Sequence, residues 1–147
     1  LTCRCCFPQV RDLLWQKYDS VVSQYLIIDC RYPYEYEAGH IKSAINVYSQ
    51  DQLFERFFSH ALSGRQILIF YCEYSQERGP RMYHNLLRRR DRVLNEPHYP
   101  KLYYPEIYLL HRGYRLFHKK FAVSRFRESL FNVHCVNCPL KFDIKYS

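Results

Sequence analysis

The sequence predicts an α/β domain with a central parallel β-sheet flanked by helices. Four segments are short and apolar, at 21–30, 44–48, 66–71 and 107–110. Helical patterns separate them along the chain, and strands that alternate with helices form a parallel sheet through right-handed crossovers. Such sheets bind ligands at the carboxyl ends of their strands. We therefore expect the functional residues directly after Cys30 and directly after Tyr71.

Three of the expected strands precede the middle of the chain. Val21–Cys30 ends in the apolar trio LII, which is typical of a buried strand. Ala44–Tyr48 is a second, shorter strand. Gln66–Tyr71 carries four consecutive apolar residues, as expected of a central strand that is covered on both faces.

Helices are expected after the second, third and fourth strands. Gln52–Leu62 places its apolar residues at helical spacing. Pro80–Asn95 begins with a proline in the first turn, where a missing N–H costs nothing. Tyr114–Phe121 is the last expected helix. The three prolines within Glu96–Glu106 exclude regular helix there, and we assign no element from residue 122 onward.

Length and composition indicate one folded domain. The chain has 147 residues, of which 48% are hydrophobic and 24% charged, and this composition excludes intrinsic disorder. We expect a lead-in at 1–20, the domain at 21–121 and a C-terminal tail at 122–147. No run approaches the ~18 apolar residues of a membrane span, and the first residues lack the apolar core of a signal peptide. Because the sequence starts at Leu1 rather than Met, we expect it to be part of a longer protein.

The net charge and the cysteine content indicate which binding partners and which cellular compartment to expect. The net charge of +8 favours acidic partners, but the densest run, RRRDR at 88–92, closes a helix, where cations keep the surface solvated. A nucleic-acid patch and a docking surface for an acidic protein are alternatives for this run; we expect neither nucleic acid nor membrane as a partner. Seven cysteines without regular spacing indicate reduced, intracellular thiols.

The candidate site follows the central strand, where five residues separate Cys72 from Arg78. A loop over a helix N-terminus directs its backbone N–H groups inward and binds an anion the size of phosphate. In such a field a cysteine pKa falls from ~8.5 toward 3.5–7.5, so that the sulfur is a nucleophile. Arg78 can bind two phosphate oxygens at once. The alternative is an inert buried thiol beside a surface arginine.

The implied reaction is the attack of Cys72 on a phosphate ester, which gives a phosphocysteine that water hydrolyses. This chemistry needs no metal and no cofactor. The leaving alcohol needs a proton, for which Glu77 and Glu73 are the nearby carboxyl groups. We favour Glu77.

Three blocks of sequence closely resemble the M-phase inducer phosphatases, the dual-specificity enzymes that activate cyclin-dependent kinases. They are IIDCRYPYEYEAGHIKSA from Ile27, CEYSQERGPRM from Cys72 and YPKLYYPEIYLLHRGY from Tyr99. The resemblance implies a rhodanese-like α/β domain. It also implies removal of phosphate from a phosphothreonine and phosphotyrosine pair in the kinase, at the start of mitosis.

By matching motifs, the resemblance makes Cys72 the nucleophile and Arg78 the phosphate-binding arginine. The loop residues that would bind the substrate phosphate with Arg78 are Glu73, Tyr74, Ser75, Gln76 and Glu77. The implied partner is a phosphorylated cyclin-dependent kinase with its cyclin. We expect a monomer, located in the nucleus and cytoplasm.

Cys30 matches a family cysteine that pairs with the nucleophile under oxidation. Neighbouring strands lie ~4.8 Å apart, near the Cα separation that a disulfide needs; a simple buried thiol is the alternative. The chain also departs from the family. Tyr71 replaces a usual His, Arg112 a usual Gly and Gln76 a frequent Ser. The first departure puts the tuning of the Cys72 pKa in doubt.

Several other residues have structural interpretations. We expect Asp29 to bind a nearby arginine, Gly39 to end a helix in the αL conformation and His40 to anchor that turn by hydrogen bonds. A zinc site is conceivable if the termini meet, although free thiols are the simpler interpretation. Its candidate residues are Cys3, Cys5, Cys6, His134, Cys135 and Cys138.

Three other functions remain as alternatives. A rhodanese-type sulfurtransferase uses the same cysteine, but its loop is generally one residue shorter than the loop before Arg78. An arsenate reductase on the same scaffold is a second option. A kinase-binding module with little or no turnover is the third, and only Tyr71 favours it.

Overall fold

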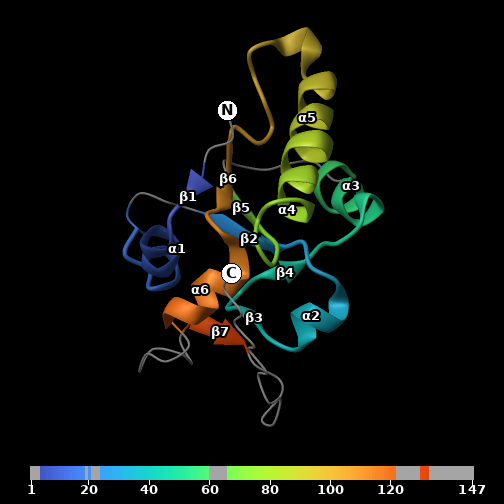
Figure 1. Cartoon of the computed structure of the whole chain (residues 1–147). Coiled ribbons are helices and arrows are strands. Elements are labelled where there is room, and N and C mark those ends of the chain that lie inside the picture. The colour runs from blue at the N-terminus through green and yellow to red at the C-terminus, as the bar shows by residue number, and fades with distance from the viewer. Residues whose placement is uncertain (1–3, 19, 21–23, 60–65, 122–129, 133–147) are drawn as a thin grey trace.

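A five-stranded parallel sheet forms the centre of the computed structural model, which describes residues 4–18, 20, 24–59, 66–121 and 130–132. Its strand order is β1-β6-β5-β2-β4, and every neighbouring pair is parallel. The strands are β1 (Arg4–Cys5), β2 (Tyr25–Asp29), β4 (Ile45–Asn46), β5 (Ile67–Tyr71) and β6 (Glu106–Leu110). A second, antiparallel pair joins β3 (His40–Ile41) to β7 (Phe131–Asn132). Figure 1 shows β5 at the centre of the sheet.

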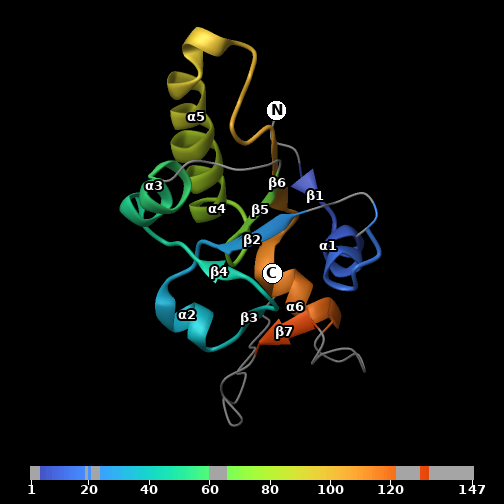
Figure 2. The ribbon, with the colours of Figure 1, turned by 180° about the vertical axis from the view of Figure 1, so that it is seen from behind.

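Helices cover both faces of this sheet (Figures 1 and 2). On one face lie α1 (Phe7–Leu14) and α6 (Gly113–Phe121). On the other lie α3 (Gln50–Phe58) and a continuous helical run of α4 (Arg78–Pro80), the π-helix η1 (Arg81–Arg88) and α5 (Arg89–Leu94). The short helix α2 (Pro33–Glu37) lies at one end of the sheet, and the 3-10 turn η2 (Glu96–His98) follows α5. None of the helices in the described part of the chain is long and apolar enough to cross a membrane.

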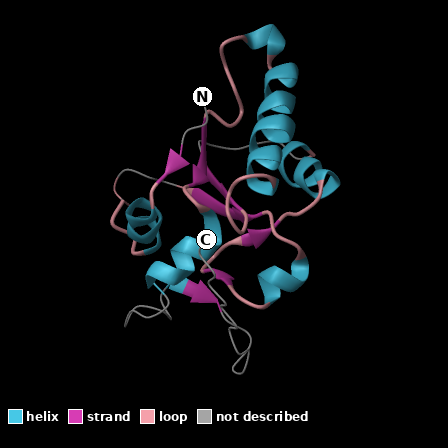
Figure 3. Cartoon of the chain, viewed as in Figure 1, coloured by secondary structure: helices cyan, strands magenta, loops and turns pink. Residues whose placement is uncertain are grey.

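Each face of the sheet buries its own apolar cluster. The α1 and α6 face packs Val10, Phe117 and Tyr71 with Leu130 and Phe131. The opposite face packs α3 and η1 side chains against the other sides of β2, β5 and β6. Successive side chains of a strand point to opposite faces, so Tyr71 belongs to the first cluster and Cys72 to the second. Figure 3 shows this division into a sheet and two helical layers.

The expected fold class is confirmed, as are the four expected strands and three expected helices, with ends that shift by a few residues. The segments that the sequence analysis left without elements contribute more than expected. β1 and α1 pack on the core before residue 21 because Cys5, Phe7, Val10 and Leu13 are buried. Leu130 and Phe131, in the expected tail, are buried as well. The domain limits at 21 and 121 stay a prediction.

The basic run at 88–92 does more than solvate the surface. Asp91 in its centre is fully buried and accepts backbone hydrogen bonds from Tyr103 and Tyr104, both at 2.9 Å. Arg88 donates to the carbonyl oxygen of Tyr104 at 2.9 Å. These contacts tie the proline-rich segment to the end of the helical run, because that segment has no ladder of its own to satisfy its backbone.

Candidate active site

The candidate site is the loop from Cys72 to Glu77, between β5 and α4. It follows the central strand at the carboxyl edge of the sheet, where we expected the functional residues. In the register of β2 and β5, Asp29 is paired with Tyr71. The residues that follow the two strands, Cys30 and Cys72, therefore lie side by side.

The first turn of helix α6 holds the first part of the loop, because its backbone N–H groups bind carbonyl oxygens of the loop. The backbone N–H of Tyr114 donates to the oxygen of Cys72, and that of Arg115 to the oxygen of Glu73, both at 3.0 Å. Gly113 makes this close approach possible: it has φ +68°, and a Cβ atom there would lie 2.4 Å from the Cys72 oxygen. The amino-terminal turn of α6 thus fixes which way the loop carbonyls point.

The amide groups of the loop remain available as donors. Within the described residues, none of the backbone N–H groups from Glu73 to Glu77 donates to a protein acceptor. Ser75 bends the loop with φ +52°, and a left-handed residue in such a turn brings successive N–H groups to one side. Its hydroxyl is buried and has no hydrogen-bond partner in the described part of the chain. The loop is therefore a set of unpaired donors suited to an anion.

The two strand-end cysteines are free, buried thiols. Cys72 is 3% exposed and Cys30 is 2% exposed. Burial, and next the neighbouring Cys72, raise the pKa of Cys30 well above its ordinary value. Cys30 is therefore held as a thiol at neutral pH. Its pairing with Cys72 under oxidation stays a prediction.

Arg78 is placed where the loop meets α4, and its guanidinium group binds Glu35 of α2. Nη1 donates to Oε2 of that carboxylate, and Nη2 donates to Oε1 at 3.0 Å. The ring of Tyr32 lies 5.2 Å from the guanidinium carbon. The hydrogen bonds to Glu35 raise the pKa of Arg78 despite its partial burial. Arg78 is thus charged, and its guanidinium group is oriented by Glu35 at the point where the loop meets α4.

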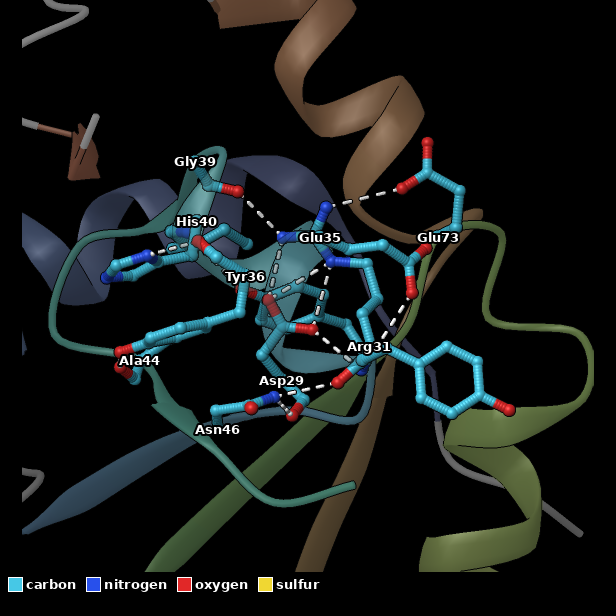
Figure 4. A network of polar contacts seen from close by, with 12 residues as sticks. Asp29, Arg31, Glu35, Tyr36, Gly39, His40, Ala44, Asn46 and Glu73 are labelled. Carbon is cyan, nitrogen blue, oxygen red and sulfur yellow. Dashed lines mark hydrogen bonds and ion pairs between the residues drawn. The ribbon is translucent and has the colours of Figure 1, made fainter. Parts of the chain in front are cut away.

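A second arginine, Arg31, fixes the base of the loop (Figure 4). It is buried and donates through Nε and Nη2 to the carboxylate of Asp29, with a shortest distance of 2.7 Å. It also donates to the carbonyl of Gly39 at 2.8 Å and to Glu73 at 3.3 Å. Its guanidinium carbon lies 3.8 Å from the ring of Tyr114. The expectation that Asp29 binds an arginine is confirmed.

The two candidate acids lie in different surroundings. Glu73 is partly buried, and its carboxylate is paired with Arg31. Glu77 is exposed at the start of α4. Within the described residues the Glu77 side chain makes no hydrogen bond or ion pair, whereas the Glu73 side chain is committed to Arg31. Of the remaining loop residues, Gln76 is exposed and Tyr74 accepts a hydrogen bond from Arg115 at 2.7 Å.

Tyr71, which stands where the resembling family has His, does not face the nucleophile. Its ring is fully buried on the opposite face of the sheet, and its hydroxyl accepts the N–H of Ile41 at 3.3 Å. Burial, and next the charge of Asp29, raise its pKa well above the ordinary value. Tyr71 therefore acts as a neutral core residue that supports the Arg31 network.

The structure also decides the smaller expectations around α2. His40 confirms its role in the turn, because its Nδ1 lies 2.9 Å from the carbonyl oxygen of Tyr36. Gly39 has φ +149°, which is not the αL conformation, so that expectation was wrong. Residues other than glycine rarely adopt this φ either. Cys5 faces the core with a pKa raised to about 12 by burial, and Cys6 is exposed. The other residues of the conceivable zinc site, Cys3, His134, Cys135 and Cys138, lie outside the described residues.

Sequence reasoning missed the residues that hold the two key side chains. Glu35 was not identified as the partner of Arg78, although it follows Pro33 within the first turn of a helix, a position that favours acidic residues. Arg31 was expected only as an unnamed partner of Asp29. Glu73 was considered only as a candidate general acid and as a loop residue that binds the substrate phosphate. The pairs Arg31–Glu73 and Glu35–Arg78 have no signal in local spacing, because each joins segments about forty residues apart.

Comparisons with known proteins agree with this architecture. The model of the rhodanese-like domain family matches residues 10–120. Human M-phase inducer phosphatase 3 is 49% identical over 113 residues, which cover 74% of this chain and 23% of that protein. The Drosophila melanogaster M-phase inducer phosphatase is 48% identical over 120 residues, 74% of this chain and 25% of its own. The chain therefore spans about a quarter of the length of these relatives.

Solved structures extend the likeness at the level of the fold. An As-Sb reductase from Leishmania major superposes with a TM-score of 0.63 at 20% identity, covering 85% of this chain and 82% of its own. A yeast protein tyrosine phosphatase of the rhodanese family superposes with a TM-score of 0.62 at 19% identity, covering 88% and 91%. At these identities the two structures support the sheet and helix arrangement alone.

Proposed function

The chain belongs to the rhodanese-like domain family, and from this we propose that it is a cysteine-dependent protein phosphatase of dual specificity. The observation that carries the proposal is the loop after β5. It places Cys72 at one end, Arg78 at the other and, between them, five amide groups that donate to no protein acceptor within the described residues. Relatives named M-phase inducer phosphatase support the same reaction class.

In the proposed first step, Sγ of Cys72 attacks the phosphorus atom of a phosphate ester. The S–P bond forms as the bond to the ester oxygen breaks, and the leaving oxygen takes a proton, which we assign to Glu77. Loop amides and Arg78 bind the phosphoryl oxygens and stabilise their charge in the transition state. Water then attacks the phosphorus, the S–P bond breaks, and inorganic phosphate and the Cys72 thiolate are released.

The proposed substrate is a phosphorylated cyclin-dependent kinase bound to its cyclin, dephosphorylated at phosphothreonine and phosphotyrosine. The names of the relatives support a role at the start of mitosis. A location in the nucleus and cytoplasm is part of the proposal. Tyr32, Tyr34 and Tyr74 are all about half exposed or more, so these aromatic side chains are available to contact a peptide substrate.

The test is phosphate release from a peptide with adjacent phosphothreonine and phosphotyrosine, under reducing conditions and without metal. We expect release by the wild type and none by Cys72→Ser, whereas Cys6→Ser, which changes an exposed thiol, should retain full activity. Sulfur transfer from thiosulfate to cyanide, measured on the same samples, tests the sulfurtransferase. A folded wild type that releases no phosphate would refute the proposal, and sulfur transfer or kinase binding would then be the function to pursue.

A further inference from the structure

The contact between Arg78 and Glu35 joins two segments that the candidate site needs to keep together. Arg78 is the first residue of α4, and Glu35 lies in the first turn of α2. The guanidinium group uses both terminal nitrogens, Nη1 and Nη2, to bind the two oxygens of one carboxylate. A two-pronged pair of this kind fixes the plane of the guanidinium as well as its position.

The pair leaves donors of Arg78 free. A guanidinium group carries five N–H bonds, and Glu35 engages one on each terminal nitrogen. Within the described residues, Nε of Arg78 makes no hydrogen bond. The edge formed by Nε and one terminal nitrogen is itself a fork that matches two oxygens of a phosphate. Glu35 and a phosphate can therefore bind the same arginine at the same time.

Glu35 is fixed by its own surroundings. Its Oε2 accepts the backbone N–H of Tyr32 at 2.9 Å, and its side chain is 19% exposed. Burial alone would raise its pKa, but the bonds and charge of Arg78 and the N–H of Tyr32 lower it instead. The Tyr32 ring covers the guanidinium at 5.2 Å. The long side chain of Arg78 is thus held by a charged carboxylate that is itself bound to the backbone at the start of α2.

We propose that Glu35 is a positioning residue for the phosphatase reaction, which orients Arg78 so that its free edge receives the phosphate. The inference rests on the proposed function and adds to it a residue outside the loop. The alternative is the opposite role, in which the carboxylate occupies the place of the substrate phosphate and must be displaced. The two roles differ in sign: a positioning carboxylate promotes phosphate binding and turnover, while a competing one opposes both.

The experiment compares Glu35→Gln with the matched control Glu37→Gln, an exposed glutamate on the same helix. With the doubly phosphorylated peptide, we expect Glu35→Gln to lower kcat/KM about 10-fold or more, because a misoriented group costs rate without losing its charge. Glu37→Gln should match the wild type. In an Arg78→Lys background, which has no fork to orient, Glu35→Gln should have almost no further effect. A merely structural role of Glu35 would give the same loss in both backgrounds.

Binding of tungstate, an oxyanion of phosphate shape, separates failure of this inference from failure of the proposed function. In calorimetric titration of the Cys72→Ser protein, Glu35→Gln should weaken tungstate binding about 10-fold, even if no peptide is ever hydrolysed. Binding that is equal or tighter would overturn the inference, and tighter binding would identify Glu35 as a competing anion. Glu35→Asp, which keeps the charge but is too short for both bonds, provides a second variant if Glu35→Gln does not fold.

Discussion

Two arginines follow neighbouring strands in the sequence, and their surroundings differ. Arg31, after β2, is 3% exposed, whereas Arg78, after the loop that follows β5, is 32% exposed. Arg31 binds Asp29, Glu73 and the carbonyl of Gly39, and it stacks on Tyr114. Arg78 binds Glu35 and keeps its Nε edge free within the described residues. The same side chain is structural where its donors are used up and available for a ligand where they are not.

The largest effect that we expect from the different surroundings of the two arginines is on the free energy of unfolding. Arg31→Met leaves the carboxylate of Asp29, which is fully buried, without its cation, and breaking a buried pair from one side costs about 3–5 kcal/mol. We expect a loss of that size in urea unfolding. Arg89→Met, at an exposed arginine of α5, should change the free energy of unfolding by less than about 0.5 kcal/mol. A small loss for Arg31→Met would mean that Asp29 finds another donor.

The next effect is on activity. Arg78→Lys keeps the positive charge but cannot bind two phosphate oxygens as a fork, so kcat/KM for the phosphopeptide should fall about 100-fold to 1000-fold. Because the pair with Glu35 is partly exposed, the free energy of unfolding should change by less than about 1 kcal/mol. Full activity of Arg78→Lys would contradict the assignment of this arginine to phosphate.

The distant contacts of Arg31 and Arg78 were harder to foresee than the loop between Cys72 and Arg78, and the reason is physical. Cys72 and Arg78 share one loop between a strand and a helix, so their spacing in the sequence already implies their geometry. Arg31 binds Asp29 two residues earlier, but its contact with Glu73, like that of Glu35 with Arg78, joins residues about forty positions apart. Only the tertiary fold brings these distant partners together. The strands were likewise predictable from local apolar runs, whereas β1, at two residues, has too little pattern to recognise.

A third arginine, Arg112, differs from these two in its backbone conformation. It is exposed, and it adopts φ +57° next to Gly113, at a position where the resembling family usually has glycine. A non-glycine residue in this conformation costs about 1–2 kcal/mol, which the greater freedom of glycine in the unfolded state partly offsets. Arg112→Gly should therefore raise the free energy of unfolding by about 1 kcal/mol at most and leave kcat/KM unchanged. Arg112→Ala, which keeps the strain, is the control and should show no gain.

The smallest effect that we expect is the pH dependence of the stability that the Arg78–Glu35 pair contributes. Burial alone would raise the pKa of Glu35, but Arg78 and the N–H of Tyr32 lower it below the ordinary glutamate value. An acid whose pKa is lower in the folded state stabilises that state above its unfolded pKa of about 4.3, and the contribution is lost as the pH falls through the folded value. Since both side chains are partly exposed, the contribution should stay below about 1 kcal/mol.

Urea unfolding of the wild type and Glu35→Gln across this acid range measures the contribution directly. The difference between the two proteins should be constant above the ordinary glutamate pKa and should shrink below it, because the protonated carboxyl of the wild type then resembles the amide. Glu37→Gln should show no such trend, since Glu37 is exposed on the same helix. A difference that persists unchanged into acid would show that Glu35 stabilises the fold through packing rather than through its charge on Arg78, and the contrast between the two arginines would then rest on burial alone.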